Sequence, residues 1–150
     1  MKTSPPSEHN APDGVILFAH GSRDPLWRKP IEAVAETMRR DHAGLIVSCA
    51  YLELCEPSLP DATRAMVTAW QGTMDSIALR ADPIKGKGLK PLKIRLVPMF
   101  LGMGKHARED LPLLVTELRA AHPQIEFEVT QTIGEDARVT ALLADLAAGA

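Results

Sequence analysis

Residues 14–25 read GVILFAHGSRDP, and this stretch decides the fold. The five consecutive apolar residues that follow Gly14 predict a strand buried on both faces, as in parallel sheets covered by helices. The sequence then changes abruptly to polar and turn-forming residues, beginning with His20. Ligands of open α/β sheets bind at this end of the strands. His20 is therefore a candidate functional residue, although a histidine beside a buried strand is more often a structural group.

The remaining chain alternates helical and strand periodicity. Strands are predicted over 45–52, 94–101 and 125–129, and helices over 30–42, 59–80 with an interruption at Gly72, from Asp110 and Pro112 to His122, and over 139–146. The strict alternation of the last strand is typical of a sheet edge. Short right-handed crossovers turn this order into an α/β fold, a four-stranded parallel sheet with helices on both faces.

Length and composition predict a single domain. The chain has 150 residues, and its net charge of −2 provides no basic surface for nucleic acid or an anionic membrane. No apolar run approaches the ~20 residues of a membrane span. Two cysteines, Cys49 and Cys55, favour a reducing compartment and a cytoplasmic protein. We expect residues 1–13 to be a disordered tail, 14–150 to be the domain, and about 81–92 to be a flexible basic loop.

Three polar residues follow three different predicted strands. His20 follows the first strand, Glu53 the second, and His106 ends a flexible glycine-rich loop after the third. The carboxyl ends of parallel strands share one edge, so the three side chains are expected to meet there. Two imidazoles and a carboxylate suit Co²⁺, Fe²⁺ or Ni²⁺. A carboxylate at a strand end is more often a solvated loop residue, and that reading of Glu53 stays open.

Three segments carry a resemblance to a known family: AHGSR at 19–23, YLELCEPSLP at 51–60, and VPMFLGMGKH at 97–106 followed by DLP at 110–112. In this order they resemble the short-form sirohydrochlorin chelatases, the class II cobalto- or ferrochelatases of the CbiX type. The resemblance implies a chelatase-like three-layer sandwich that inserts Co²⁺ or Fe²⁺ into sirohydrochlorin without ATP, in the synthesis of cobalamin or sirohaem. It implies no prosthetic group, and it implies a homodimer.

The resemblance also assigns roles to residues. His20 and His106 would hold the metal substrate and assist deprotonation, with Glu53 beside them. Ser22, Arg23, Gly104 and Lys105 are the expected substrate-binding residues. Cations suit the many carboxylates of sirohydrochlorin, so Arg28 and the lysines of the basic loop are further candidates.

Other functions remain to be weighed. A non-catalytic metal carrier or tetrapyrrole-binding module would show the same ligands without turnover. A phosphoryl-transfer enzyme could use His20 as its nucleophile, but Ala19 stands where such an enzyme usually has an arginine. Dinucleotide binding is disfavoured because no G-x-G-x-x-G follows the first strand.

Overall fold

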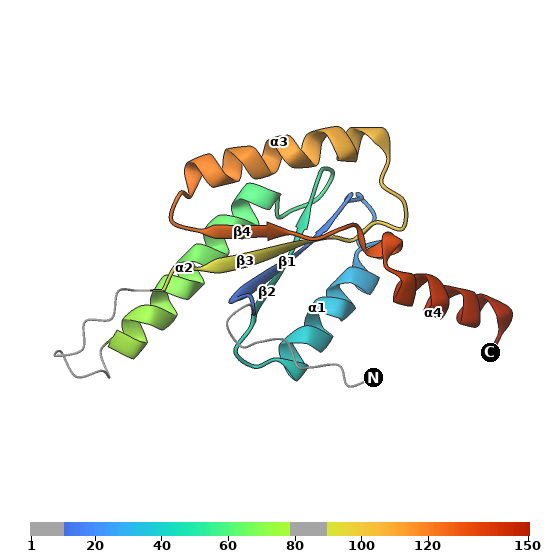
Figure 1. Cartoon of the computed structure of the whole chain (residues 1–150), viewed down its shortest axis with the longest axis horizontal. Coiled ribbons are helices and arrows are strands. Elements are labelled where there is room, and N and C mark those ends of the chain that lie inside the picture. Colours follow the sequence, from blue (N-terminus) through green and yellow to red (C-terminus); the bar gives the residue numbers. More distant parts are fainter. Residues whose placement is uncertain (1–10, 79–89) are drawn as a thin grey trace.

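The computed structural model of the chain describes residues 11–78 and 90–150 (Figure 1). Its elements are β1 (Gly14–Ala19), α1 (Lys29–Asp41), β2 (Ile46–Tyr51), α2 (Leu59–Ala78), β3 (Lys93–Pro98), α3 (Lys105–Ala121), β4 (Glu126–Val129), the 3₁₀ helix η2 (Ile133–Glu135) and α4 (Ala137–Ala148). Residues 1–10 of the expected tail and 81–89 of the expected basic loop lie outside the described residues. No helix in the described part is long and apolar enough to span a membrane.

The four strands form one parallel sheet in the order β2-β1-β3-β4. All six residues of β1 are buried, since this strand has a partner on each side and helices on both faces. The alternating strand β4 lies at an edge, as its pattern predicts. The predicted α/β architecture, a four-stranded parallel sheet with helices on both faces, is therefore confirmed.

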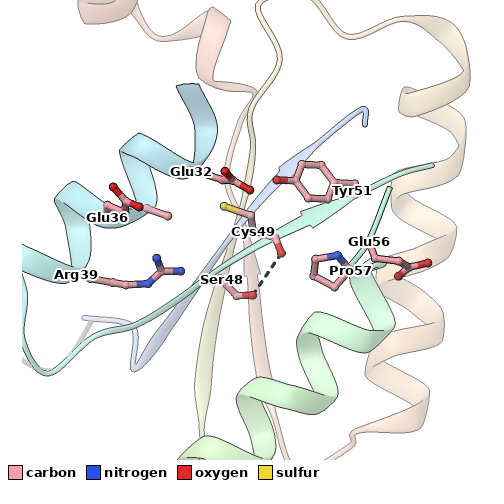
Figure 2. Close-up of a pocket in the computed structure, with 9 residues that line it drawn as sticks. Glu32, Glu36, Arg39, Ser48, Cys49, Tyr51, Glu56 and Pro57 are labelled. Atoms are coloured by element: carbon pink, nitrogen blue, oxygen red, sulfur yellow. Dashed lines mark hydrogen bonds between the residues drawn. The ribbon is translucent and has the colours of Figure 1, made fainter. Parts of the chain in front are cut away.

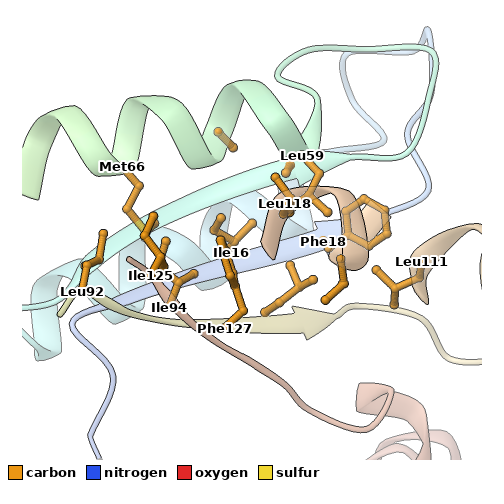
Figure 3. Close-up of a cluster of buried hydrophobic side chains, with 14 of the residues drawn as sticks. Ile16, Phe18, Leu59, Met66, Leu92, Ile94, Leu111, Leu118, Ile125 and Phe127 are labelled. Atoms are coloured by element: carbon orange, nitrogen blue, oxygen red, sulfur yellow. The ribbon is translucent and has the colours of Figure 1, made fainter. Parts of the chain in front are cut away.

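Helices α2 and α3 cover one face of the sheet, and α1 covers part of the other (Figure 1). The α2–α3 face contains the larger core (Figure 3), in which Ile16 and Phe18 of β1 pack among side chains of both helices and of β3. The intervening β1 residues, Val15 and Leu17, point to the opposite face and pack with Ala35 of α1 and Val47 of β2. Side chains of a strand alternate between faces, so β1 contributes to both cores.

Both edge strands are held by charged side chains. The Arg39 guanidinium of α1 donates from Nε and Nη2 to the Val47 carbonyl of β2, at 3.2 and 2.8 Å. At the opposite edge, Arg95 of β3 pairs with Glu128 of β4 at 2.8 Å. Asp13, placed in the tail by its sequence, is tied to the sheet because its carboxylate accepts from the Lys93 amide at 2.9 Å.

Three details of the helices and strands differ from the sequence-based predictions: the course of α2, the end of β3 and the start of α3. The glycine at 72 does not interrupt α2, which runs without a break from Leu59 to Ala78. The cap of this helix is as predicted, with the Ser58 hydroxyl accepting from the Asp61 amide at 3.3 Å. The third strand was predicted over 94–101, with Pro98 as the point where ladder pairing stops or the strand bends. It does end at Pro98, whose ring nitrogen has no hydrogen to donate to the ladder.

The largest difference lies at the start of α3. Because proline is favoured in the first turn of a helix, Asp110 and Pro112 were expected to open it. The helix instead begins at Lys105, five residues before Asp110, and Pro112 lies in its interior. Lys105 and His106 therefore belong to the first turn of a helix and not to a flexible loop.

The last helix forms where predicted but does not pack on the sheet. None of its residues is buried, and Leu142 and Leu146 are 58% and 64% exposed. In Figure 1, α4 extends away from the sheet beyond η2. An apolar stripe on a surface helix normally faces a core, so α4 leaves uncovered a surface of the kind that proteins bury.

Candidate active site

A cavity of about 360 Å³ opens at the carboxyl ends of the strands. It is lined by His20, Leu52, Glu53, His106 and Asp110. The three residues predicted from the sequence to meet at one sheet edge therefore do line one cavity. Asp110 lines it as well, although its sequence position suggested only a helix start.

The first two polar residues are placed by an extension of the sheet ladder. His20 directly follows β1, and Glu53 follows β2 by two residues. Beyond the strand ends, the Leu52 amide donates to the Ala19 carbonyl at 2.9 Å and the Glu53 amide to the His20 carbonyl at 3.0 Å. The imidazole and the carboxylate are thus carried by two backbones that remain paired up to the cavity.

Gly21 allows these two backbones to approach so closely. Its φ is +100°, a conformation that L side chains rarely adopt, and a Cβ there would lie 1.8 Å from the Glu53 carbonyl oxygen. Only glycine fits at this position without moving Glu53. The glycine of the HGSR segment therefore has a structural role in placing the neighbouring acidic residue.

The His20 imidazole and the Glu53 carboxylate face one another, with Nε2 and Oε1 3.6 Å apart. In the tautomer that carries its proton on Nδ1, this nitrogen donates to the Gly21 carbonyl at 3.4 Å and leaves Nε2 as an acceptor. The side chains are 51% and 55% exposed, so water screens their attraction. Both donor atoms remain accessible from the cavity.

His106 and Asp110 enter the cavity from α3. They are four residues apart on one helix and therefore neighbours on its surface. Both side chains are exposed, and neither makes a hydrogen bond or ion pair within the described part of the chain. If the helix had been predicted to begin at Lys105, the four-residue spacing from His106 would have identified Asp110 as a second cavity residue from the sequence.

The donor groups are not gathered into a closed metal site. Among residues 11–78 and 90–150, no three His, Cys, Asp or Glu side chains lie close enough together to hold an ion. The His20–Glu53 pair and the α3 side chains instead line one open cavity from different elements. Such an arrangement offers ligands to an ion without enclosing it.

The residues expected to bind substrate near β1 lie outside the cavity lining. The Ser22 hydroxyl accepts from the Asp24 amide at 3.1 Å and so stabilises the turn after the strand. Arg23 is exposed and makes no ion pair in the described part of the chain. The Arg28 guanidinium faces Glu32 at 3.4 Å on α1. Of these residues, Arg23 is the cation most available to an acidic ligand.

The expected substrate-binding residues before α3 are likewise outside the lining. Gly104 is the N-cap of α3, and a Cβ there would contact nothing within 4 Å, so the backbone does not require glycine. The Lys105 ammonium is exposed, and its nearest carboxylate is Glu109 at 3.9 Å. Lys105 therefore lies beside His106 in the first helical turn, with its charge largely open to solvent.

A second cavity, of about 320 Å³, lies between α1 and the edge strand β2 (Figure 2). Burial raises the pKa of the Cys49 thiol and raises that of Tyr51 to about 12. The buried Tyr51 hydroxyl has no hydrogen-bond partner among the described residues. A thiol with a raised pKa stays protonated and is a poor metal ligand. The acid–base and metal-binding groups are therefore better placed in the first cavity.

Fold and cavity together define a class of protein. It is a small parallel α/β domain whose open cavity at the strand ends is lined by two imidazoles and two carboxylates. The sequence model of the CbiX family matches residues 14–74 and 87–150, and the chain belongs to that family. The resemblance found in the sequence segments is thereby confirmed.

Several relatives are named chelatases. The sirohydrochlorin cobaltochelatase of Methanopyrus kandleri is 30% identical over 101 residues, covering 67% of this chain and 57% of that protein. The sirohydrochlorin cobaltochelatase of Methanococcoides burtonii is 27% identical over 137 residues, covering 89% of each. The chloroplastic sirohydrochlorin ferrochelatase of Arabidopsis thaliana is 26% identical over 122 residues, covering 81% of this chain and 45% of that protein. The chain spans between 57% and 64% of the length of four of the cobaltochelatases that it matches.

Solved structures show the same fold. The crystal structure of a CbiX protein of Marinobacter aquaeolei VT8 superimposes with a TM-score of 0.66 at 28% identity, covering 92% of this chain and 96% of that one. The sirohydrochlorin chelatase SirB of Bacillus subtilis, in complex with cobalt, superimposes with a TM-score of 0.64 over 92% of this chain and 51% of that one. Its identity is 21%, so this second likeness is one of fold alone.

Proposed function

We propose that the chain is a sirohydrochlorin metal chelatase that inserts Co²⁺ or Fe²⁺ into sirohydrochlorin without ATP. One observation carries the proposal: in a chain of the CbiX family, His20, Glu53 and His106 line a single open cavity at the strand ends. Relatives named for cobalt and for iron support both metals as substrates. Because imidazole and carboxylate ligands suit both ions, the choice between them is left to experiment.

The reaction requires both metal ligands and bases. The divalent ion replaces two pyrrole N–H protons, so each turnover forms the metal–nitrogen bonds and releases two protons. In the proposal His20 and His106 present the ion at the cavity, and one of them accepts a proton as the ion passes to the ring nitrogens, while the second proton is released to water. A histidine whose lone pair is not engaged by the ion can act as a base near neutral pH.

The geometry of His20 and Glu53 supports shared binding of the ion. Metal–nitrogen and metal–oxygen bonds of about 2.0–2.2 Å, at ordinary coordination angles, place two ligand atoms roughly 3.0–3.6 Å apart. The observed Nε2 to Oε1 distance of 3.6 Å lies at the upper end of that range. Glu53 would therefore bind the ion directly beside His20, or orient the imidazole when the ion has left.

Weak enclosure of the ion supports transfer. A closed set of protein ligands would have to be broken before the ring nitrogens could bind. In the described residues no such closed set exists, and the donors that line the cavity are exposed. The exposed cations Arg23 and Lys105 lie at the same edge of the sheet, where they can attract the carboxylates of the tetrapyrrole.

We also propose that the chain acts as a homodimer in the cytoplasm. The uncovered leucines of α4 support pairing, since a second copy would bury an apolar stripe that this chain leaves exposed. The two cysteines, Cys49 and Cys55, are free thiols, which suits a reducing compartment.

Metal insertion can be measured directly from the absorbance of sirohydrochlorin incubated with Co²⁺ or Fe²⁺. Replacing His20 or His106 by Ala should lower the rate by roughly a hundredfold or more, because each change removes a ligand and a possible base. Glu53→Gln should have a smaller effect in the same direction. His42→Ala is the matched control, since His42 is an exposed histidine at the C-cap of α1, away from the cavity.

The outcomes separate the alternatives. Wild-type protein that binds metal and tetrapyrrole without accelerating insertion would be a carrier or binding module. Full activity in both histidine variants would contradict the assigned site within an otherwise active chelatase. Hydrolysis of a phosphomonoester that is lost in His20→Ala would instead support phosphoryl transfer.

A further inference from the structure

Two loops at the carboxyl edge of the sheet each present an exposed leucine. Leu54 lies between β2 and α2 and is 50% exposed, and Leu101 lies between β3 and α3 and is 70% exposed. Neither contributes to either hydrophobic core. An exposed leucine is ordinary by itself, but Leu54 directly follows the cavity residue Glu53, and Leu101 lies in the loop that leads to α3, the helix that carries His106.

Leu54 is held in an unfavourable backbone conformation. Its φ is +68°, and it is the one non-glycine residue with a positive φ in the described part of the chain. A branched aliphatic side chain is costly there, and Asn or Gly would be favoured. Strained residues of this kind are concentrated at functional sites, where the side chain is needed for another reason.

The backbone beside Leu54 is fixed. The preceding residue, Glu53, donates its amide to the His20 carbonyl at 3.0 Å, and its own carbonyl oxygen lies against Gly21. The side chain of Glu53 lines the cavity, so Leu54 has a fixed position next to a cavity residue.

Leu101 is fixed in a comparable way by a different segment. The Gly134 amide donates to the Phe100 carbonyl at 2.9 Å, and a Cβ on Gly134 would lie 2.0 Å from the Leu101 carbonyl oxygen. The loop after β3 is therefore packed against η2 while the Leu101 side chain remains in solvent. Both leucines are thus exposed on well-supported backbones.

The strand order places these leucines on opposite sides of the cavity histidine. Because β1 lies between β2 and β3, the residue that follows it, His20, lies between the two loops. We infer that Leu54 and Leu101 are substrate-positioning residues that contact the apolar face of the tetrapyrrole ring on either side of His20. This inference rests on the proposed chelatase function.

The chemistry of the ligand favours this occupant. Ring nitrogens must come within bonding distance of an ion held at His20, and the macrocycle that surrounds them extends onto the neighbouring loops. Its face is apolar and its periphery acidic, so it requires apolar side chains beneath the ring and cations around it. Leu54 and Leu101 supply the first, and Arg23 and Lys105 supply the second.

Leu54→Asn and Leu101→Asn test the inference, with Ile77→Asn as the matched control. Ile77 is 53% exposed and lies at the C-terminal end of α2, the end remote from the β2–α2 loop. Binding of metal-free sirohydrochlorin is followed by fluorescence and insertion of Co²⁺ by absorbance. Each leucine variant should raise the Kd and KM for the tetrapyrrole about fivefold, as loss of a partly buried leucine predicts. The KM for Co²⁺ and the kcat should stay unchanged.

Thermal melting separates positioning from structure. Asn tolerates a positive φ, so Leu54→Asn should retain or raise the melting temperature while it weakens tetrapyrrole binding. A merely structural leucine would show no such opposite effects. Unchanged tetrapyrrole affinity in both leucine variants would overturn the inference even if the wild type inserts metal. If the wild type binds the metal-free tetrapyrrole without inserting Co²⁺, the proposed chelatase function is contradicted. The binding titration of the leucine variants still decides whether the two leucines contact the tetrapyrrole.

Discussion

The two faces of the sheet are completed to different extents. On the α2–α3 face, sixteen buried residues of the described chain form one cluster, and the buried Thr63 hydroxyl donates to the Leu59 carbonyl at 2.9 Å. On the α1 face the buried cluster has four residues, and the Tyr51 hydroxyl has no partner among the described residues. The described chain thus buries far more apolar side chains on the α2–α3 face, while the α1 face keeps a smaller buried cluster and an unsatisfied polar group.

This difference indicates where the chain is open to further association. A parallel sheet normally has both faces covered by helices. Here α1 covers part of one face, and α4, the remaining candidate, extends away from it (Figure 1). Stability of the single chain should therefore depend mainly on the α2–α3 face, and association mainly on the other.

The largest expected change in the free energy of unfolding comes from substitutions of two neighbouring residues of β1. Ile16 and Leu17 are equally buried but point to opposite faces. Ile16→Ala should lower the free energy of unfolding by about 3–5 kcal/mol, because its cavity lies within the larger and less yielding cluster. Leu17→Ala should cost about 2–3 kcal/mol, since fewer buried neighbours surround it. Urea titrations of both variants measure the two losses, and equal losses would contradict the comparison.

A smaller effect should appear at high pH on the α1 face. Burial raises the pKa of Tyr51 to about 12 in the folded chain, while an unfolded tyrosine titrates near 10. Between these values the unfolded chain loses the proton first, so the free energy of unfolding should fall by about 1 kcal/mol per pH unit as the pH rises.

Tyr51→Phe is the control for this titration. It removes the hydroxyl that ionises and leaves no buried polar group unpaired, so its stability at neutral pH should stay close to that of the wild type. The Tyr51-dependent part of the fall between pH 10 and 12 should disappear. The same slope in wild type and variant would show that other groups cause it.

The smallest effect on the single chain should come from α4. Leu142→Gln combined with Leu146→Gln should change the unfolding free energy of the monomer by less than about 0.5 kcal/mol, because both side chains are exposed. The same change should weaken the proposed dimer, as measured by sedimentation across a concentration series. Ile77→Gln, an exposed position on α2, is the matched control. A double variant that associates as the wild type does would place the dimer contact elsewhere.

The sequence predicted the elements whose signals are local. The apolar run before His20 predicts a doubly buried strand, and Ser58 with Asp61 predicts the start of α2; both are found. The predicted start of α3 was wrong. Proline is strongly favoured in the first turn of a helix, but here the packing of Ala107, Leu111 and Val115 overrides that preference of Pro112. Periodicity gives the apolar stripe of a helix but not its partner, so α4 could be predicted as a helix but not as an unpacked one.

The candidate site was predicted in part for the same reason. Parallel topology places the residues after each strand at one edge, and His20, Glu53 and His106 do line one cavity. Asp110 was not predicted as a cavity residue, because it lies on the same helix face as His106 only if α3 already begins at Lys105. Leu54 gave no signal at all, since a positive φ at leucine contradicts its residue preference and becomes visible only in three dimensions.

The charged groups at the two edge strands have a consequence for assembly. Exposed strand edges are templates for the open-ended addition of further strands, which leads to fibrils. Here Arg39 occupies the carbonyl of Val47 on one edge, and the other edge is the four-residue strand β4, whose Glu128 is bonded to Arg95. Growth of the sheet by strand addition is thereby discouraged at both margins. The proposed dimer would then form through helices, in a contact that closes on itself and stays finite.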